Sequence, residues 1–499
     1  MPDLLTQPAT DLLALLASNH LSALDLANQT IARIEQLNPH LNALVDFNPD
    51  TIREQARTLD NTKIRGPLHG LPLTIKSSIS VAGHLCETGS LLNQGRRPTE
   101  DAETVRRLRA AGALILGTTN CPEFLMAYET DNILHGRTSN PWDLTRTAGG
   151  SSGGESAAIA AGLSAGGLGS DGGGSVRTPA HFTGICALKP TPGRIPTSGH
   201  LPDNTGPFAL LGTIGPMART IADVTLLFRI LSGPLDTDPI SAPVPYQTLS
   251  PEAVKHTRIG YLEDDGLVPV TAETRQAVHD AVHSLRRHGF HVEPFRPASL
   301  ERARKLWYTF FVRCGAMLLE PFALTHPSAL SPTFLNFLDI AHTQPPLTAN
   351  ELLNAWCEID LIRAQLLAEM RDFPILLSPV CSIPAFRHGE RHWTLHTPAS
   401  THLTPHPDRQ LPPSAQDSAQ DLGYLDAMRF TQWFNLLGSP AAVVPIAHSS
   451  EGLPIGLQLA GRPFADELVL AIAALLEQDF GYTPPPHLPS TQLPLAADE

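Results

Sequence analysis

The chain has 499 residues, with 35 basic and 49 acidic side chains, and 42% of its residues are apolar. This length allows two to four domains, or one large α/β unit with a substantial core. Only 17% of the residues are charged, which excludes disorder as the ground state of most of the chain. The net charge of −14 also argues against binding to a nucleic-acid backbone, which requires clustered lysine and arginine. We therefore expect no nucleic-acid partner.

The sequence carries no recognisable targeting or membrane signal. Residues 1–5 (MPDLL) lack the basic residues and the apolar run of a secretory signal. The longest uncharged apolar runs, Leu468–Leu476 and Ala157–Ala165, are shorter than the ~20 residues that span a bilayer. Six scattered cysteines without a CxxC pair favour buried free thiols over disulfides or a zinc site. These features predict a cytoplasmic protein without a membrane span.

The N-terminal part alternates between helical and strand patterns. From residue 10 to residue 34, leucine and isoleucine recur at helical spacing, which predicts two amphipathic helices. The apolar, β-branched run Leu71–Val81 predicts a strand. Ala102–Ala111 predicts a helix that Gly112 ends, and Ala113–Leu116 predicts the strand that follows.

The same alternation returns later in the chain. Arg258–Leu262 predicts a strand, Thr271–His288 a helix, and His291–Phe295 a further strand. Strands that alternate with helices are typical of α/β proteins, so we expect helices packed on a largely parallel sheet.

Two stretches are typical of connectors, residues 233–251 and the run rich in proline and histidine at residues 388–413. The tail after Tyr482 is predicted to be disordered. Histidines at four-residue spacing could bind a metal from one helix face, but the prolines prevent most of the second stretch from being helical. Solvated loop histidines are therefore favoured over a metal site for His388, His392, His396, His402 and His406.

Glycine is concentrated between Gly149 and Ser175, where 11 of the 37 glycines fall within 27 residues. Glycine costs about 0.5–1 kcal/mol per position inside regular structure, so a particular backbone shape or a close approach requires it here. A catalytic turn with a hydroxyl nucleophile and a flexible linker are the two alternatives. Residues 167–172 match a dinucleotide-binding pattern, but no acidic residue follows at the required distance. Residues 149–153 match a nucleophile elbow, but the residues before them look like a loop.

Lys76 is one of only five lysines beside 30 arginines, and it alone lies in an apolar run, LPLTIK. Burial disfavours the ammonium form and can lower a lysine pKa by up to ~3–5 units, which would make a neutral amine available as a base. The alternative is a lysine at a strand end whose stem reaches solvent. The strand pattern alone leaves both open.

Four ordered motifs together resemble the amidase signature family: GPLHGLP leading to Lys76, GTTNCPEF at 117–124, NPWD at 140–143 and the block 149–191. The similarity runs from about residue 12 to residue 233 and returns more weakly at 430–464. It implies a large twisted mixed sheet with helices on both faces. It also implies one amidase domain over residues 1–482, with its signature core at about 60–233, and a tail at 483–499.

The resemblance also implies a site. By similarity to the family, Ser175 accepts the acyl group, Ser151 follows a cis peptide bond and relays a proton, and neutral Lys76 is the base. The N–H groups of residues 172–175 would stabilise the oxyanion. The oxyanion residues implied are Gly172, Gly173 and Gly174, and the segment that lines the acyl site in the family, which could equally be core, is Leu125, Met126 and Ala127.

The activity implied is hydrolysis of the C–N bond of a small carboxylic amide through an acyl-Ser175 intermediate, without metal or cofactor. Aliphatic and aryl amides, esters and carbamates are all compatible with it. The apolar stretch Trp307–Leu319 is consistent with an apolar acyl pocket or with a core helix. The alternatives are the A subunit of a glutamyl-tRNA amidotransferase and a catalytically silent binding protein on the same fold. A homodimer is compatible with the resemblance, and the sequence does not fix the oligomeric state.

Several positions depart from the family pattern. Ser77 stands where many members have an acidic residue, and Gly172 replaces a residue with a side chain, which would loosen the oxyanion loop or widen the pocket. Thr178 stands where the amidotransferase chain has Gln, and locally the sequence is more similar to fatty acid amide hydrolase. We expect Asp171 to bind loop N–H groups, and we leave open whether Arg177 has a structural or a functional role.

Overall fold

The computed structural model describes residues 3–397 and 418–486. Its centre is an 11-stranded sheet, and two small two-stranded sheets pair β4 (Ser139–Asn140) with β5 (Asp143–Thr147) and β12 (His392–Thr397) with β13 (Ser418–Gly423). In spatial order, the strands of the large sheet are β1 (Leu44–Phe47), β3 (Leu114–Thr119), β2 (Pro72–Lys76), β6 (Gly166–Asp171), β8 (Thr213–Ala218), β7 (Cys186–Lys189), β14 (Ala441–His448), β15 (Pro454–Gly461), β11 (Ile375–Pro379), β9 (Arg258–Tyr261) and β10 (His291–Pro294).

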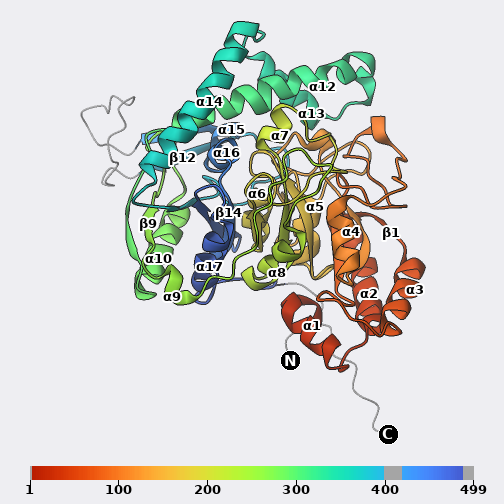
Figure 1. Cartoon of the computed structure of the whole chain (residues 1–499). Coiled ribbons are helices and arrows are strands. Elements are labelled where there is room, and N and C mark those ends of the chain that lie inside the picture. Colours follow the sequence, from red (N-terminus) through yellow and green to blue (C-terminus); the bar gives the residue numbers. More distant parts are fainter. Residues whose placement is uncertain (1–2, 398–417, 487–499) are drawn as a thin grey trace.

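The helices surround this sheet (Figure 1). Short 3₁₀ turns at Leu4–Thr6, Leu91–Asn93, Glu123–Leu125 and Pro327–Ala329 and a π-helical turn at Tyr308–Arg313 complete the regular structure. The α-helices are α1 (Ala9–Ala17), α2 (Ala23–Leu41), α3 (Pro49–Asp60), α4 (Glu103–Ala110), α5 (Gly153–Ala160), α6 (Arg177–Thr183), α7 (Pro207–Leu211), α8 (Ile221–Leu231), α9 (Pro251–Val254), α10 (Ala272–Arg287), α11 (Leu300–Trp307), α12 (Cys314–Thr325), α13 (Pro332–His342), α14 (Ala349–Glu369), α15 (Tyr424–Ala427), α16 (Arg429–Leu436) and α17 (Asp466–Glu477).

The sheet is mixed rather than largely parallel. Its neighbouring strands pair parallel in β3–β2–β6 and in β11–β9–β10, and antiparallel at the other six junctions. The alternation of helices and strands in the sequence predicts only the parallel groups β3–β2–β6 and β11–β9–β10. The antiparallel centre is built from strands far apart in the chain, such as β7 beside β14, and no local pattern encodes that pairing.

Apolar side chains cover both faces of the sheet. Successive residues of a strand point to opposite faces. Along β14, Ala442 and Val444 join the core that contains residues of α17, whereas Val443 between them joins a core that contains Ala180 of α6. Helices therefore pack on both faces, as the resemblance implies.

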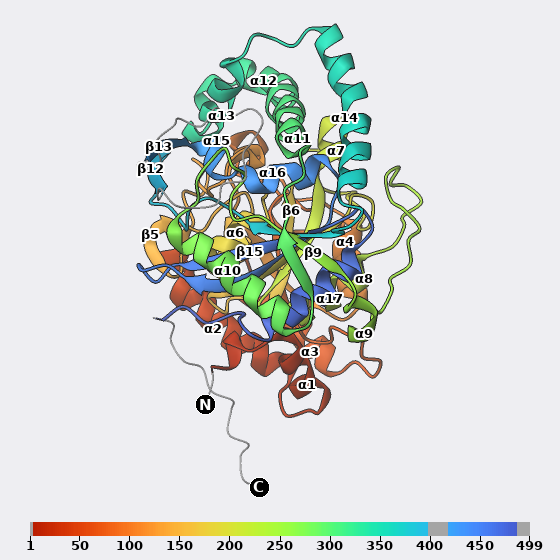
Figure 2. The same ribbon diagram turned by 90° about the vertical axis from the view of Figure 1, so that its left-hand side faces the viewer.

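A layer of helices covers one end of the sheet. Helices α12, α13 and α14 lie together at the top of Figure 1, and Figure 2 shows them from the side. A third apolar core, which includes Trp307 and Phe334, joins these helices to α11 and α16. This layer lies above the site described below, because Trp307 contacts the chain directly after β6.

Most predicted elements occur where the sequence pattern places them, namely α1, α2, α4, β3, β9, α10 and β10. Strand β2 is shorter than Leu71–Val81, because the chain turns after Lys76, where the Ile79 N–H donates to the Lys76 carbonyl (2.9 Å). Residues 233–250 form the predicted connector.

Other predictions were wrong. The residues before Gly149 form β5 rather than a loop, although β5 belongs to a small separate sheet. His392 and His396 lie on β12, because its partner β13 pairs with that part of the expected loop. Five of the six cysteines are buried free thiols, but Cys357 is exposed on α14.

Some predictions concern residues outside the described part of the chain. His402, His406 and residues 487–499 lie there, so the structure tests neither the full histidine cluster nor most of the tail. Among the described residues, no group of three or more His, Cys, Asp or Glu side chains could hold a metal ion. No helix in residues 3–397 and 418–486 is long and apolar enough to cross a membrane.

Candidate active site

The end of one strand and two loops meet at the site. Lys76 is the last residue of β2, and β2 lies beside β6, which ends at Asp171. One loop leads into α5 and carries Ser151, and the other connects β6 to α6 and carries Ser175. The Ser152 N–H donates to the Ser175 carbonyl (3.1 Å) and ties the two loops together.

The Lys76 side chain is fully buried and does not reach solvent, which excludes the strand-end alternative. Its Nζ lies 2.7 Å from the Ser151 Oγ and within 3.1–3.2 Å of the hydroxyl oxygens of Ser152 and Ser170. Burial lowers the pKa of Lys76 to about 8. At pH 7 roughly a tenth of the Lys76 side chains therefore carry a neutral amine, a far larger fraction than for a lysine with the ordinary pKa of 10.5.

The surroundings of Lys76 contain a fully buried acid, Glu155. Its carboxyl group accepts hydrogen bonds from the hydroxyls of Thr74 (2.6 Å) and Thr119 (2.9 Å). Burial raises the pKa of Glu155 above its usual range, and its hydrogen bonds and the charge of Lys76 oppose that rise. Ser77, where the sequence departs from the family, contacts the Cys121 thiol instead of Lys76.

The peptide bond between Gly150 and Ser151 is cis. Ser151 is almost fully buried, and its side chain lines a cavity that Ser175 also lines. Ser175 is 7% exposed. The structure thus joins Lys76 directly to Ser151 and brings Ser175 to the same cavity.

The loop between β6 and α6 is held by its carbonyl oxygens. The Trp307 indole donates to the Gly172 carbonyl (2.9 Å), and the Tyr128 hydroxyl donates to the Gly173 carbonyl (2.9 Å). The Thr431 hydroxyl also donates to the Gly173 carbonyl (2.7 Å). Because a trans peptide unit is planar, fixing the carbonyl of one residue also fixes the N–H of the next.

The N–H groups of this loop, which the resemblance assigns to the oxyanion, differ in whether they already have an acceptor. The Gly174 N–H donates to Asp171 Oδ1 (2.7 Å), so it is already engaged. The N–H groups of Gly172, Gly173 and Ser175 have no acceptor among the residues that the structure describes. The resemblance implies Gly172, Gly173 and Gly174 as oxyanion residues. Of these, only Gly174 has its N–H engaged, with Asp171.

The glycines leave space that aromatic rings occupy. A Cβ at Gly172 would lie 2.7 Å from the Phe311 ring, and one at Gly173 would lie 2.5 Å from the Trp307 ring. Phe311 therefore fills the place of the side chain that Gly172 lacks. Gly172 therefore does not widen the pocket, and the expectation that it loosens the loop stays a prediction.

Asp171 and Arg177 form a fully buried ion pair behind the loop. Arg177 also donates to the side chains of Asn435 (2.5 Å) and Gln458 (3.0 Å). Burial alone would raise the pKa of Asp171, but the Arg177 charge and its hydrogen bonds hold that pKa well below the usual value. Arg177 is thus structural, and Asp171 binds the loop N–H groups of Gly174 and Val176, as expected.

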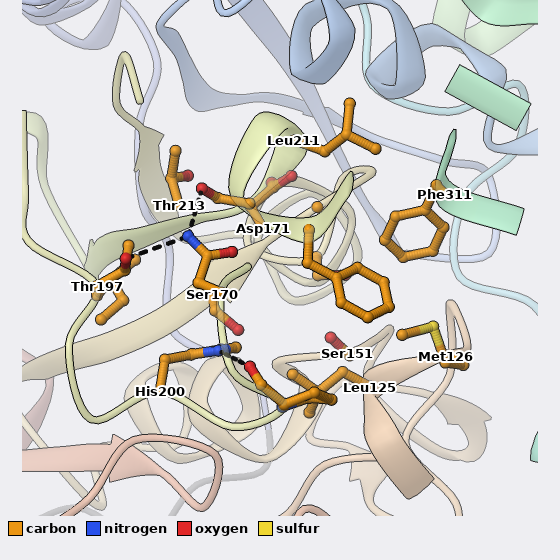
Figure 3. A pocket seen from close by; sticks show the side chains of 17 residues that line it. Leu125, Met126, Ser151, Ser170, Asp171, Thr197, His200, Leu211, Thr213 and Phe311 are labelled. Carbon is orange, nitrogen blue, oxygen red and sulfur yellow. Dashed lines mark hydrogen bonds between the residues drawn. The ribbon is translucent and has the colours of Figure 1, made fainter. Parts of the chain in front are cut away.

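The cavity has two narrow lobes that share Ser175 as a wall residue. Four residues line both lobes: Leu125, Met126, Ser175 and Phe311. Figure 3 shows the first lobe, with Thr197, Thr213 and His200 on one side and Met126 and Phe311 on the other. Ser151, Ser170 and Asp171 line only this first lobe.

His200 is a neutral polar group in the first lobe. Burial, together with the charge of Lys76, lowers the pKa of His200 to about 4. Its Nδ1 donates to the Pro202 carbonyl (3.0 Å), which leaves Nε2 as the unprotonated nitrogen. His200 therefore brings no positive charge to the first lobe at neutral pH.

The second lobe is mainly apolar and aromatic. Of the segment predicted to line the site, Leu125 and Met126 line both lobes, and Ala127 lines the second lobe only. Trp307, Phe311 and Val312 of the apolar stretch also line the second lobe, so part of that stretch is a pocket wall. The walls unique to this lobe include Tyr128, Trp307, Val312, Phe337, Ile340, Tyr424 and Leu425.

Sequence reasoning missed the residues that hold the loop from outside the glycine-rich segment. Trp307, Thr431 and Asn435 come from helices more than 130 residues further along the chain than Gly172. Their side chains carry no local signal of this contact. Ser170, by contrast, lies inside the segment and could have been proposed as a partner of Lys76.

Comparisons with known proteins identify the family of the chain. A family model described as Amidase matches residues 25–470. The chain is 34% identical over 480 residues to an acylamidase of Rhodococcus erythropolis, with 94% of each chain covered. It is 30% identical over 492 residues to the A subunit of the glutamyl-tRNA(Gln) amidotransferase of Desulfatibacillum aliphaticivorans, with 92% of this chain and 94% of that one covered.

A solved structure gives the same result for the fold. The structure of 6-aminohexanoate cyclic dimer hydrolase complexed with substrate is similar with a TM-score of 0.80 at 28% identity, over 97% of this chain and 99% of that one. The chain therefore belongs to the amidase family and is an amide-hydrolysing enzyme.

Proposed function

We propose that the protein cleaves amides by transferring the acyl group to Ser175. A serine hydroxyl is a weak nucleophile until a base removes its proton. In this mechanism Ser151 passes that proton to neutral Lys76 and later returns it to the leaving amine. The observation that supports the proposal most strongly is the fully buried Lys76 amine at 2.7 Å from Ser151.

Stabilisation of the oxyanion falls to the loop after β6. The N–H groups of Gly172, Gly173 and Ser175 are the candidate donors, since the Gly174 N–H is engaged with Asp171. Each such donor contributes about 2.7–4 kcal/mol to the transition state in enzymes where one has been removed. Trp307, Tyr128 and Thr431 support this role by fixing the loop carbonyls.

The two lobes receive different halves of the substrate. The leaving nitrogen must lie beside Ser151, because that hydroxyl returns the proton to it. Ser151 lines the first lobe and not the second. The amine portion therefore occupies the first lobe, and the acyl group occupies the second.

The second lobe favours an uncharged apolar acyl group. Aromatic and aliphatic side chains line it, and the acid among its described wall residues, Glu129, is paired with Arg391. Apolar surface buried there contributes about 25 cal/mol per Å². Esters with the same acyl group, and carbamates with an apolar substituent on the carbonyl, fit the same site, because their carbonyl carbon meets the same nucleophile.

A panel of 4-nitroanilides with acyl chains of increasing length tests the function on the chain purified alone. Turnover without a partner, rising with acyl length, is the expected result. The rival is the A subunit of an amidotransferase, which would act with partner chains. Failure to hydrolyse any substrate alone, together with stable association with tRNA-charging proteins, would favour that rival.

A catalytically silent binding protein on the same fold is the second rival. It would bind amides without turnover, and a fluorophosphonate would leave no covalent adduct on the folded protein.

We also propose that residues 1–482 form one domain, since the central sheet contains strands from both halves of the chain. Size-exclusion chromatography with light scattering tests whether the enzyme is a homodimer.

A further inference from the structure

A surface groove of about 640 Å³ lies next to the first lobe. It is formed by four parts of the chain: the residues around the turn Leu91–Asn93, Phe124, the segment 201–208 and the end of α12. Helix α12 packs against α7, which begins at the end of the segment 201–208. In Figure 1, α7 lies below α12.

The groove and the first lobe share two wall residues, Pro202 and Phe208. The Phe208 ring lies edge-on to the ring of Phe311, which is one of the residues that line both lobes, with 6.3 Å between the ring centroids. The groove therefore adjoins the first lobe at Pro202 and Phe208, and the first lobe leads to Ser175. A substituent on the leaving nitrogen that outgrows the first lobe would pass Phe208 and Pro202 into the groove.

The groove exposes large apolar side chains. Leu318 is 47% exposed and Phe322 is 49% exposed on α12, although both are large apolar residues. Phe322 continues the apolar wall inward, since its ring lies 6.0 Å from the ring of Phe124. Clustered apolar exposure of this kind marks a binding surface more often than scattered single residues do.

The charge of the groove narrows the class of ligand. Among the residues that the structure describes, its wall contains one acid, Asp203, and one histidine, His326, and neither lysine nor arginine. These walls offer no fixed positive charge to a carboxylate or a phosphate, so the groove suits an uncharged apolar chain.

We infer that this groove is an extended amine subsite, which binds the distal part of N-alkyl or N-arylalkyl amides whose amine portion is longer than the first lobe. The inference depends on the proposed function, because it places the leaving nitrogen beside Ser151. It predicts that the enzyme selects substrates by the length of the amine as well as by the acyl group.

The test uses butanoyl amides of ethylamine, butylamine and octylamine, with the released amine measured by fluorescamine. The purified full chain should show a rise in kcat/KM of about tenfold or more from ethyl to octyl, since each fully buried methylene is worth about fourfold. The variants Phe322→Asp and Leu318→Asp should each abolish most of this rise and leave hydrolysis of the ethylamide unchanged. Leu361→Asp is the matched control, because Leu361 is 70% exposed on α14 and lines neither the groove nor the lobes.

The outcomes separate the two proposals. Hydrolysis of no amide at all would overturn the proposed function. Hydrolysis of the ethylamide with no dependence on amine length, or a dependence that both variants retain, would overturn only the groove inference. A second series with ethylamine fixed and the acyl chain lengthened should respond equally in wild type and Phe322→Asp. If Phe322→Asp abolished the acyl-length dependence instead, the groove would serve the acyl group and the inference would be wrong.

Discussion

The Nζ atom of Lys76 lies 2.7 Å from the Ser151 hydroxyl oxygen, inside a site where the Lys76 side chain has no exposed surface. This amine is the base that contacts Ser151, whereas the carboxyl group of the neighbouring Glu155 is hydrogen-bonded to Thr74 and Thr119. The mechanism therefore depends on a single side chain for both proton transfers. Replacing the Lys76 side chain should therefore impair both transfers.

Lys76→Ala should reduce kcat/KM for an anilide by about 10²–10⁴-fold, the usual contribution of a general base. Lys76→Arg should be impaired to a similar degree, because a guanidinium stays protonated and cannot accept the proton. Initial rates and circular dichroism on the same samples measure activity and fold. Lys305→Ala, a change to an exposed lysine on α11, is the control and should be fully active. A Lys76→Arg enzyme with wild-type turnover would exclude Lys76 as the base.

The pH dependence follows from the lowered pKa of Lys76. The folded-state pKa is about 8, against an ordinary value of 10.5, so the amine is protonated below about pH 8 and neutral above it. The rate should therefore rise with pH to a plateau above about pH 8 and fall by about tenfold per unit well below it. Steady-state rates of an uncharged anilide between about pH 5 and about pH 9.5 measure this. A flat profile across the acid range would be inconsistent with a neutral amine base.

The fold was only partly predictable from the sequence. Helical and strand periodicity located α10, β9 and β3, because each buries one stripe or one short run of apolar residues. The pairing of β7 with β14 was not predictable, since it joins segments about 250 residues apart by backbone hydrogen bonds that no side-chain pattern records. β12 was missed for a related reason, because its pairing partner β13 lies beyond the proline-rich stretch.

The site was predictable where its residues lie in motifs that resemble the family. Family resemblance indicated Lys76, Ser151 and Ser175, and the structure brings all three to one place. The support of the loop was not predictable. Trp307 and Phe311 reach Gly172 only through the packing of the helical layer, and a tryptophan in an apolar stretch is equally consistent with core.

Trp307→Phe should separate the two roles of this residue. Phenylalanine keeps an aromatic wall in the second lobe but loses the hydrogen bond to the Gly172 carbonyl. One hydrogen bond is worth about 1 kcal/mol, so kcat should fall about fivefold while KM changes little. Phe337→Leu is the control in the same lobe, where no bond to the loop is lost, and it should change KM for long acyl chains more than kcat. A Trp307→Phe enzyme with altered KM and unchanged kcat would show that the indole serves only as a wall.

Gly172 and Phe311 should be coupled in stability, because the Phe311 ring occupies the place of a Cβ at position 172. Gly172→Ala should lower the free energy of unfolding by about 1–3 kcal/mol, the typical cost of overpacking. In a Phe311→Ala background the same change should cost at least about 1 kcal/mol less, as measured by urea denaturation in a double-mutant cycle. Gly423→Ala is the control, since its nearest neighbour would lie 3.9 Å away. Equal costs in both backgrounds would mean that the ring is not the obstacle.

Covalent labelling tests in a single experiment whether Ser175 is the nucleophile and whether Lys76 activates it. The purified protein is treated with a fluorophosphonate at about pH 8, and the modified residue is identified by peptide mass spectrometry in the wild type and in Lys76→Ala. We expect one adduct, on Ser175, formed at least about 10²-fold more slowly when Lys76 is absent. An adduct on a different residue, or equal labelling rates for the two proteins, would refute this mechanism.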